Sequence, residues 1–164
     1  RALAYSSRCE QIAMYTGNDD NIVADLLTTY QFNINGKKVE KQFIGGLLGH
    51  WAVWTQKAVA LLAEVKAYKA NKNQAAADAL LTKGIEITDV NAAMFDPANH
   101  FHGCIPGIHE ILRRQGLLNG IWCLNPNEQL SAGQADEITR VYEAYPHLND
   151  DDFVKQFLSA DQTN

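Results

Sequence analysis

The chain has 164 residues, of which 14 are basic and 19 acidic, so its formal net charge is -5. This length is typical of one domain that buries a core, and 46% hydrophobic residues is ordinary for a globular protein. The acidic balance and the lack of a basic stripe argue against a nucleic-acid partner. The longest apolar run, residues 58–63, is far too short to cross a bilayer, so we expect no membrane partner.

The three cysteines, Cys9, Cys104 and Cys123, have no paired spacing. An odd number of such cysteines is typical of reduced thiols, and no signal-peptide pattern opens the sequence. We therefore expect a cytoplasmic protein without a disulfide framework.

Two strand–helix units dominate the first part of the chain. Residues 2–10 are predicted to end a helix. Residues 11–16 form a short apolar strand, which ends in Gly-Asn-Asp-Asp at residues 17–20 and is followed by a helix. Residues 42–48 form a second, glycine-rich strand, which leads into an amphipathic helix that begins near Trp51. The βαβ order predicts that the two strands are parallel neighbours, with their carboxyl ends at one edge.

A surface hairpin is predicted between these two units, at residues 31–41. Its centre is the dipeptide Asn35-Gly36, which is flanked by alternating residues. An Asn-Gly pair favours a two-residue turn, because both turn positions need a positive φ.

The residues from 72 to 164 are predicted to form a helical extension, distinct from the strand-containing part at residues 1–71. A long helix runs from Lys72 to about Asp96 and is interrupted at Gly84. Pro106 is well placed in the first turn of the next helix, and Gly116 is its C-terminal cap.

Two further helices are predicted near the carboxyl end. Ser131 and Gln134 have the spacing of a capping box, in which each side chain bonds to the other residue's backbone. A last short helix, about residues 150–158, is expected to pack Phe153 and Phe157 against the core.

The order of these elements resembles the carboxyl-terminal half of the dihydrodipicolinate synthase and N-acetylneuraminate lyase superfamily. Residues 16–19 (Thr-Gly-Asn-Asp) resemble that family's Ser-Gly-Asp-Asp segment at the end of strand seven, and residues 44–48 resemble strand eight. Residues 104–108 (Cys-Ile-Pro-Gly-Ile) through 114–117 (Arg-Gln-Gly-Leu) resemble its Pro-x-x-x-Lys helix and Gly-Leu end. The similarity covers most of the chain and is closest to an uncharacterised bacterial branch.

The resemblance implies an α/β fold that is mostly α by content. In it, residues 1–71 are the last two βα units of a (β/α)8 TIM barrel, with the hairpin near residues 31–41 inserted, and residues 72–164 are a C-terminal helical extension. It also implies a homo-oligomer that acts on a pyruvate-like 2-keto acid through a Schiff base, without a cofactor.

The same resemblance places the catalytic groups outside this chain. The family's Schiff-base lysine and its proton-relaying tyrosine lie on earlier strands, before the position of Arg1. Lys41 lies at the entering end of the second strand, opposite the catalytic face. We therefore expect no catalytic residue here, and we expect the rest of the barrel or a second chain to complete the protein.

The expected substrate-binding residues lie at the carboxyl ends of the two strands, where backbone amides and an imidazole suit a small carboxylate. They are Gly17, Asn18, Asp19, Gly46, Leu47 and His50.

Each of these residues also has a structural interpretation. Asp19 and Asp20 are equally suited to cap a helix. His50 is also interpreted as a surface or hydrogen-bonded histidine without a ligand. Glycine at positions 45 and 46 either lets a keto acid approach the backbone or relieves crowding in the barrel.

Two other functions remain open from the sequence: a non-catalytic barrel relative that binds a small acid or a protein, and a purely helical interaction module whose two strands are buried loops. A zinc site is a further alternative, because His100, His102, Cys104 and His109 are suitable ligand types. Their spacing matches no common zinc module, so we expect no metal.

Overall fold

In the computed structural model, which describes residues 1–161, the two predicted strands are parallel neighbours. β1 (Met14–Thr16) pairs with β4 (Phe43–Gly46). The pairing continues beyond the strands, because the Leu47 N–H donates to the Thr16 carbonyl at 2.9 Å. The prediction of a parallel pair is confirmed, although both strands are shorter than the predicted ranges.

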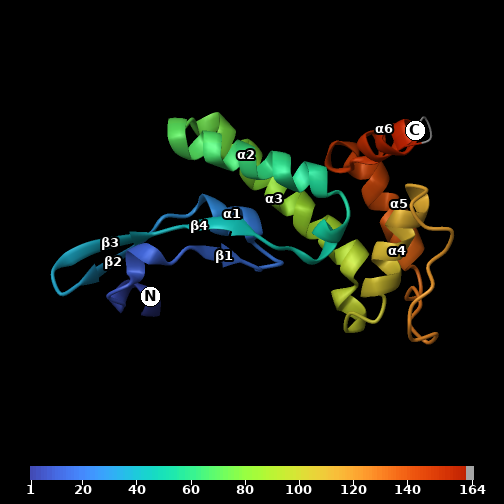
Figure 1. Ribbon diagram of the computed structural model, residues 1–164, viewed down its shortest axis with the longest axis horizontal. Helices are drawn as coiled ribbons and strands as arrows, with labels where there is room; N and C mark the ends of the chain where they lie inside the picture. Colours follow the sequence, from blue (N-terminus) through green and yellow to red (C-terminus); the bar gives the residue numbers. More distant parts are fainter. Residues whose placement is uncertain (162–164) are drawn as a thin grey trace.

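The fold is α/β and holds more helix than strand. The α-helices are α1 (Ile22–Leu27), α2 (Thr55–Asn71), α3 (Gln74–Phe95), α4 (Cys104–Arg114), α5 (Gln134–Ala144) and α6 (Asp151–Asp161). Short 3-10 helices are η1 (Ala2–Tyr5), η2 (Cys9–Gln11), η3 (Gly49–Ala52), η4 (Pro97–Asn99) and η5 (Pro146–Leu148). The molecule is elongated, with the strands at one end and α4, α5 and α6 at the other (Figure 1).

The predicted hairpin is confirmed. β2 (Tyr30–Ile34) and β3 (Lys37–Lys41) are antiparallel, and the turn residues Asn35 and Gly36 have φ of 52° and 79°. In Figure 1 the hairpin extends away from the helices and forms one tip of the molecule.

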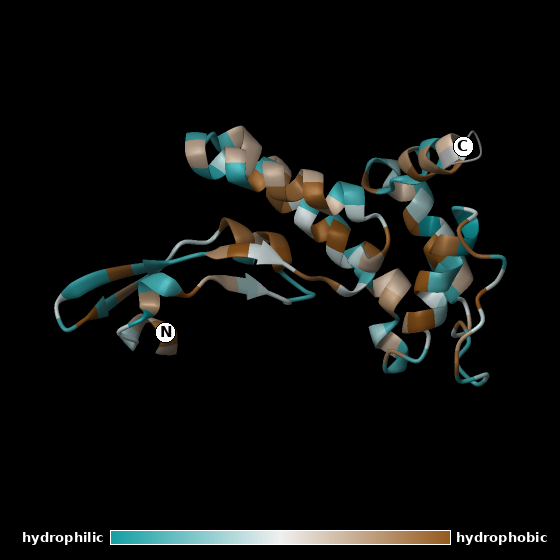
Figure 2. Cartoon of the chain, in the orientation of Figure 1, coloured by the Kyte–Doolittle hydropathy of each residue, from teal (hydrophilic) through white to brown (hydrophobic). Residues whose placement is uncertain are grey.

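The core follows α3, against which α1, α4 and α5 all pack. Val90 and Met94 of α3 are fully buried, as are Ile111 of α4 and Ile138 of α5. Figure 2 shows hydrophobic residues gathered where α1, α2 and α3 face one another. The core therefore joins residues from both predicted parts of the chain, those before and those after residue 71. Within residues 1–161, no helix is long and apolar enough to cross a bilayer.

Several local predictions are wrong. Residues 2–10 form the 3-10 helices η1 and η2, not the end of an α-helix. Helix α3 runs without interruption through Gly84. A Cβ at Gly84 would lie only 3.1 Å from the Cβ of Val23, so this glycine allows α1 to approach α3 closely. Phe153 and Phe157 of α6 are exposed, not packed.

Of the two predicted helix caps, the one at the end of α4 is confirmed and the one at the start of α5 is confirmed only in part. Gly116 has a φ of 78°, and the Leu117 N–H donates to the Leu112 carbonyl at 2.9 Å, which confirms the predicted glycine cap of α4. Only half of the predicted capping box forms. Gln134 accepts from the Ser131 N–H at 3.0 Å, but the Ser131 hydroxyl donates to Asp96 at 2.5 Å.

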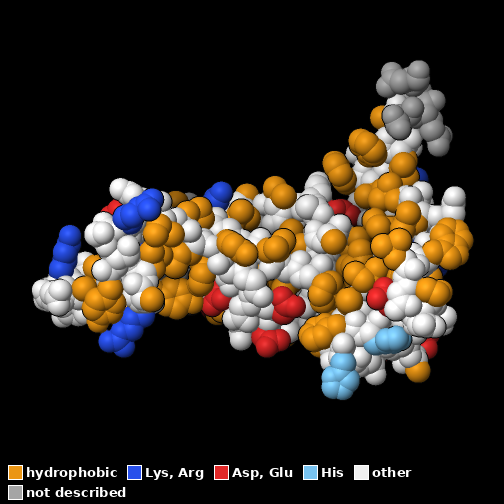
Figure 3. Space-filling model, turned by 60° about the horizontal axis from the view of Figure 1, so that its bottom comes forward, with side chains coloured by type: hydrophobic (Ala, Val, Ile, Leu, Met, Phe, Trp, Pro, Cys, Tyr) orange, Lys and Arg blue, Asp and Glu red, His pale blue; other side chains and the backbone are white. Residues whose placement is uncertain are grey.

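One face of the parallel strand pair is covered and the other is bare. Ile22, Val23 and Leu26 of α1 are buried on the covered side. Tyr15 and Ile44 are 68% and 62% exposed. Figure 3 shows hydrophobic side chains on the outer surface of the strand-containing end. Among the residues that the structure describes, β1 and β4 each have a single strand neighbour, so each also has a free edge.

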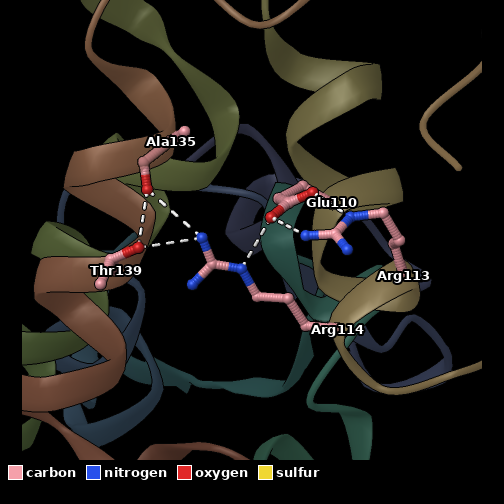
Figure 4. A network of polar contacts seen from close by, with 5 residues as sticks. All are labelled: Glu110, Arg113, Arg114, Ala135 and Thr139. Carbon is pink, nitrogen blue, oxygen red and sulfur yellow. Dashed lines mark hydrogen bonds and ion pairs between the residues drawn. The ribbon is translucent and has the colours of Figure 1, made fainter.

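Helices α4 and α5 are joined by a charged network around Glu110 (Figure 4). The Glu110 carboxylate, which is 7% exposed, accepts hydrogen bonds from Arg113 at 2.7 and 2.8 Å and from Arg114 at 2.8 Å. Arg114 also donates to the Thr139 hydroxyl at 3.0 Å. The hydrogen bonds from Arg113 lower the pKa of Glu110, burial raises it, and the hydrogen bond from Arg114 lowers it again. The net result is a pKa below the usual value for glutamate.

We expect Glu110→Ala to lower the free energy of unfolding by about 2 kcal/mol, because it leaves Arg114 without its carboxylate partner. Urea denaturation of both chains measures the change. The matched control is Glu137→Ala, which removes an exposed i,i+3 pair with Arg140 at 2.9 Å and should change stability by less than about 0.5 kcal/mol. Equal losses in the two variants would contradict the structural role of Glu110.

Candidate functional site

The loop that follows β1 is held by a carboxylate of α1. Asp25 accepts hydrogen bonds from the hydroxyls of Thr16 at 2.7 Å and Tyr30 at 2.9 Å, and from the side-chain amide of Asn18 at 3.3 Å. Burial raises the pKa of Asp25, but these hydrogen bonds outweigh it and hold the pKa below its usual value. Asn18, predicted to bind substrate, therefore uses its amide to fix the loop.

A chain of hydrogen bonds links the loops that follow the two strands. The Oδ1 atom of Asn91, in the middle of α3, accepts a hydrogen bond from the His50 backbone N–H at 3.1 Å. The same oxygen lies 3.2 Å from His50 Nδ1. The side-chain amide nitrogen of Asn91 donates to Asp19 Oδ2 at 3.4 Å. Two predicted site residues, Asp19 and His50, are thus connected through a residue that the sequence analysis did not select.

These contacts define the state of the His50 imidazole. Because Asn91 Oδ1 accepts, Nδ1 carries the proton and Nε2 has a free lone pair. Burial lowers the pKa of His50 to about 4, although the bond to Asn91 acts in the opposite direction. Near neutral pH the ring is therefore uncharged, and Nε2 is a hydrogen-bond acceptor.

Glycine at position 46 is explained by packing. A Cβ there would lie 2.9 Å from Ile22 Cδ1 and 3.4 Å from the Trp51 ring, so the missing side chain makes room for α1. At Gly45 a Cβ would meet nothing within 4 Å. The crowding at Gly46 is therefore against α1 and Trp51, whereas the sequence interpretation placed it in the interior of a barrel.

Only three of the six predicted site residues line one of two pockets. Gly46 and Leu47 line a mostly apolar pocket of about 190 Å³ between β4 and α2. His50 lines another pocket, of about 160 Å³, whose walls come from η3, α2, α3 and η5; we call it the His50 pocket. Trp51 lines both pockets, whereas residues 17–19 line neither. Gly17 and Leu47 still lie close, since a Cβ at Gly17 would be 3.6 Å from the Leu47 carbonyl.

Asn91 is the residue of this hydrogen-bonded chain that sequence reasoning missed. A signal was present, because Asn91 is a polar residue on an otherwise apolar stripe of α3, next to Val90 and four residues after Ile87. A buried amide in such a stripe needs polar partners, and here Asp19 and His50 provide them.

The histidine-rich segment near α4 does not form a metal site within the described residues. Among residues 1–161, no three His, Cys, Asp or Glu side chains lie close enough together to hold a metal ion. His109 approaches Cys123, with 3.9 Å between Nδ1 and Sγ, and all three cysteines are free thiols.

The chain has no recognisable relative by any of three comparisons. No family model, no curated protein and no solved structure matches it.

Proposed function

We propose that this chain contributes the last two βα units of a (β/α)8 barrel that acts on a pyruvate-like 2-keto acid through a Schiff base. The observation that carries the proposal is the parallel pair of β1 and β4, which is covered by α1 on one face and bare on the other. In this proposal the protein is cytoplasmic and a homo-oligomer.

The bare face supports a larger sheet. Parallel strands are normally covered on both faces and paired at both edges, because their connections run through helices. The side chains of Tyr15, Ile44 and Leu47 are large, apolar and mostly exposed on or beside this pair. Further strands on the free edges would bury them, as the closed interior of a barrel does.

The lysines of this chain do not suit Schiff-base chemistry. Such a lysine must lose its proton to attack a carbonyl, and it must lie at the carboxyl ends of the strands. Lys41 precedes β4, donates a hydrogen bond to the Cys9 carbonyl and lies 3.6 Å from the Glu10 carboxylate. Both contacts hold the Lys41 side chain at the entering end of β4, so the proposal assigns the catalytic lysine to strands outside residues 1–164.

The test is borohydride trapping with pyruvate on the protein purified from its native source, followed by peptide mass spectrometry. We expect an adduct on a lysine that lies outside Arg1–Asn164. The same treatment of the 164-residue chain should leave its mass of 18.2 kDa unchanged. An adduct on Lys41, or no adduct on any lysine of the native protein, would contradict the proposal.

A further inference from the structure

The lining of the His50 pocket contains an unpaired positive charge. Among the described residues, the Lys57 ammonium has no ion pair or hydrogen bond, although it lines the pocket. The second ammonium, Lys83, is neutralised by Glu64 at 2.7 Å, and His147 bonds to Glu86 at 2.8 Å. Within the described residues, Lys57 is therefore the ammonium of the lining that has no carboxylate partner, which favours an anionic ligand there.

His50 supplies a hydrogen-bond acceptor to the lining of the same pocket. His50 is only 2% exposed, and its Nδ1 is occupied by Asn91. Its Nε2 has no hydrogen-bond partner within residues 1–161, and burial keeps it unprotonated near neutral pH. An acceptor without a partner in the lining of a pocket favours a ligand that donates a hydrogen bond.

Apolar side chains make up much of the rest of the lining. They include Trp51, Trp54, Leu61, Ile87 and Leu148. The pocket volume of about 160 Å³ is close to that of an engineered cavity, about 150 Å³, which binds benzene. A pocket of this volume therefore fits a single six-membered ring.

We propose that the His50 pocket binds a small, flat hydroxy acid. The carboxylate of the ligand pairs with Lys57, its ring packs on the tryptophans, and its hydroxyl donates to His50 Nε2. The pocket lies on the helical side and includes neither Tyr15 nor Ile44, so this proposal stands or falls separately from the proposed barrel.

The probe is 4-hydroxybenzoate, and the readout is the set of tryptophan indole N–H signals in ¹H–¹⁵N spectra of the 164-residue chain. Trp51 and Trp54 should shift saturably, with a dissociation constant of about 1 mM. Trp122 is 76% exposed and lies outside the pocket, so its signal should not move. No saturable shift, or equal shifts of all three signals, would overturn the proposal.

Two surface variants test the carboxylate contact without disturbing the core. Lys57→Gln should weaken 4-hydroxybenzoate binding about fivefold and leave binding of the uncharged 4-hydroxybenzyl alcohol unchanged. Lys66→Gln, on an exposed position of the same helix, should bind both compounds as the parent chain does. For the hydroxyl contact, benzoate should bind more weakly than 4-hydroxybenzoate. Unaltered affinity in Lys57→Gln, or equal affinity for the two acids, would contradict the assigned contacts.

Discussion

Replacing Gly107 with alanine should lower the free energy of unfolding by about 3 kcal/mol, as measured by urea denaturation. Gly107 lies in α4, where that helix crosses the end of α3. A Cβ there would lie 2.1 Å from the Met94 carbonyl oxygen and 2.9 Å from Gln134 Nε2. Because a backbone carbonyl cannot rotate away as a side chain can, α4 must move and lose its close packing.

The matched control for this substitution is Gly45→Ala. A Cβ at Gly45 meets nothing within 4 Å, so this variant should be as stable as the parent chain to within about 1 kcal/mol. If Gly107→Ala were as stable as Gly45→Ala, the described crossing of α3 and α4 would be incorrect.

Acidification from about pH 7 to about pH 4.5 should lower the free energy of unfolding by about 2 kcal/mol through His50 alone. The folded chain holds the pKa of His50 at about 4, because the ring is buried, whereas the usual value is 6.5. Between these two values the unfolded chain binds a proton that the folded chain does not. The contribution is therefore fully present above about pH 6.5 and is lost as the pH falls.

The variant His50→Gln separates this effect from other titrations. Its unfolding free energy should differ between the two pH values by much less than that of the parent chain, whatever its stability at neutral pH. The carboxylates with lowered pKa values, such as Asp25 and Glu110, have ordinary values of 3.8 and 4.5, so they lose their contribution at lower pH. A His50 ring signal that titrates near pH 6.5 in NMR spectra would contradict the assigned burial.

The sequence predicted elements whose signals are local. The Asn35-Gly36 pair predicted its hairpin because both residues must adopt positive φ. Gly116 predicted the end of α4 for the same reason. The prediction of a helix interruption at Gly84 was wrong. This glycine allows Val23 of another helix to approach closely, and no local sequence pattern indicates such a contact.

The candidate site was predicted in part. Asp19 and His50 were selected from their places after the two strands, and the structure connects them. The connection itself passes through Asn91, 41 residues after His50, and depends on how α3 lies across the strand ends. Likewise, the Ser131 hydroxyl does not make the predicted capping bond but donates to Asp96, which is 35 residues away in the sequence. Such long-range partners are set by packing and not by spacing.

The central claim, that β1 and β4 belong to a larger parallel sheet, is tested most directly by hydroxyl-radical footprinting of Tyr15. The protein from its native source is compared with the 164-residue chain, in which Tyr15 is 68% exposed. Trp122, which is 76% exposed, serves as the internal reference. We expect Tyr15 to be protected in the native protein while Trp122 stays reactive in both samples. Oxidation of Tyr15 at the same rate in both would contradict the claim.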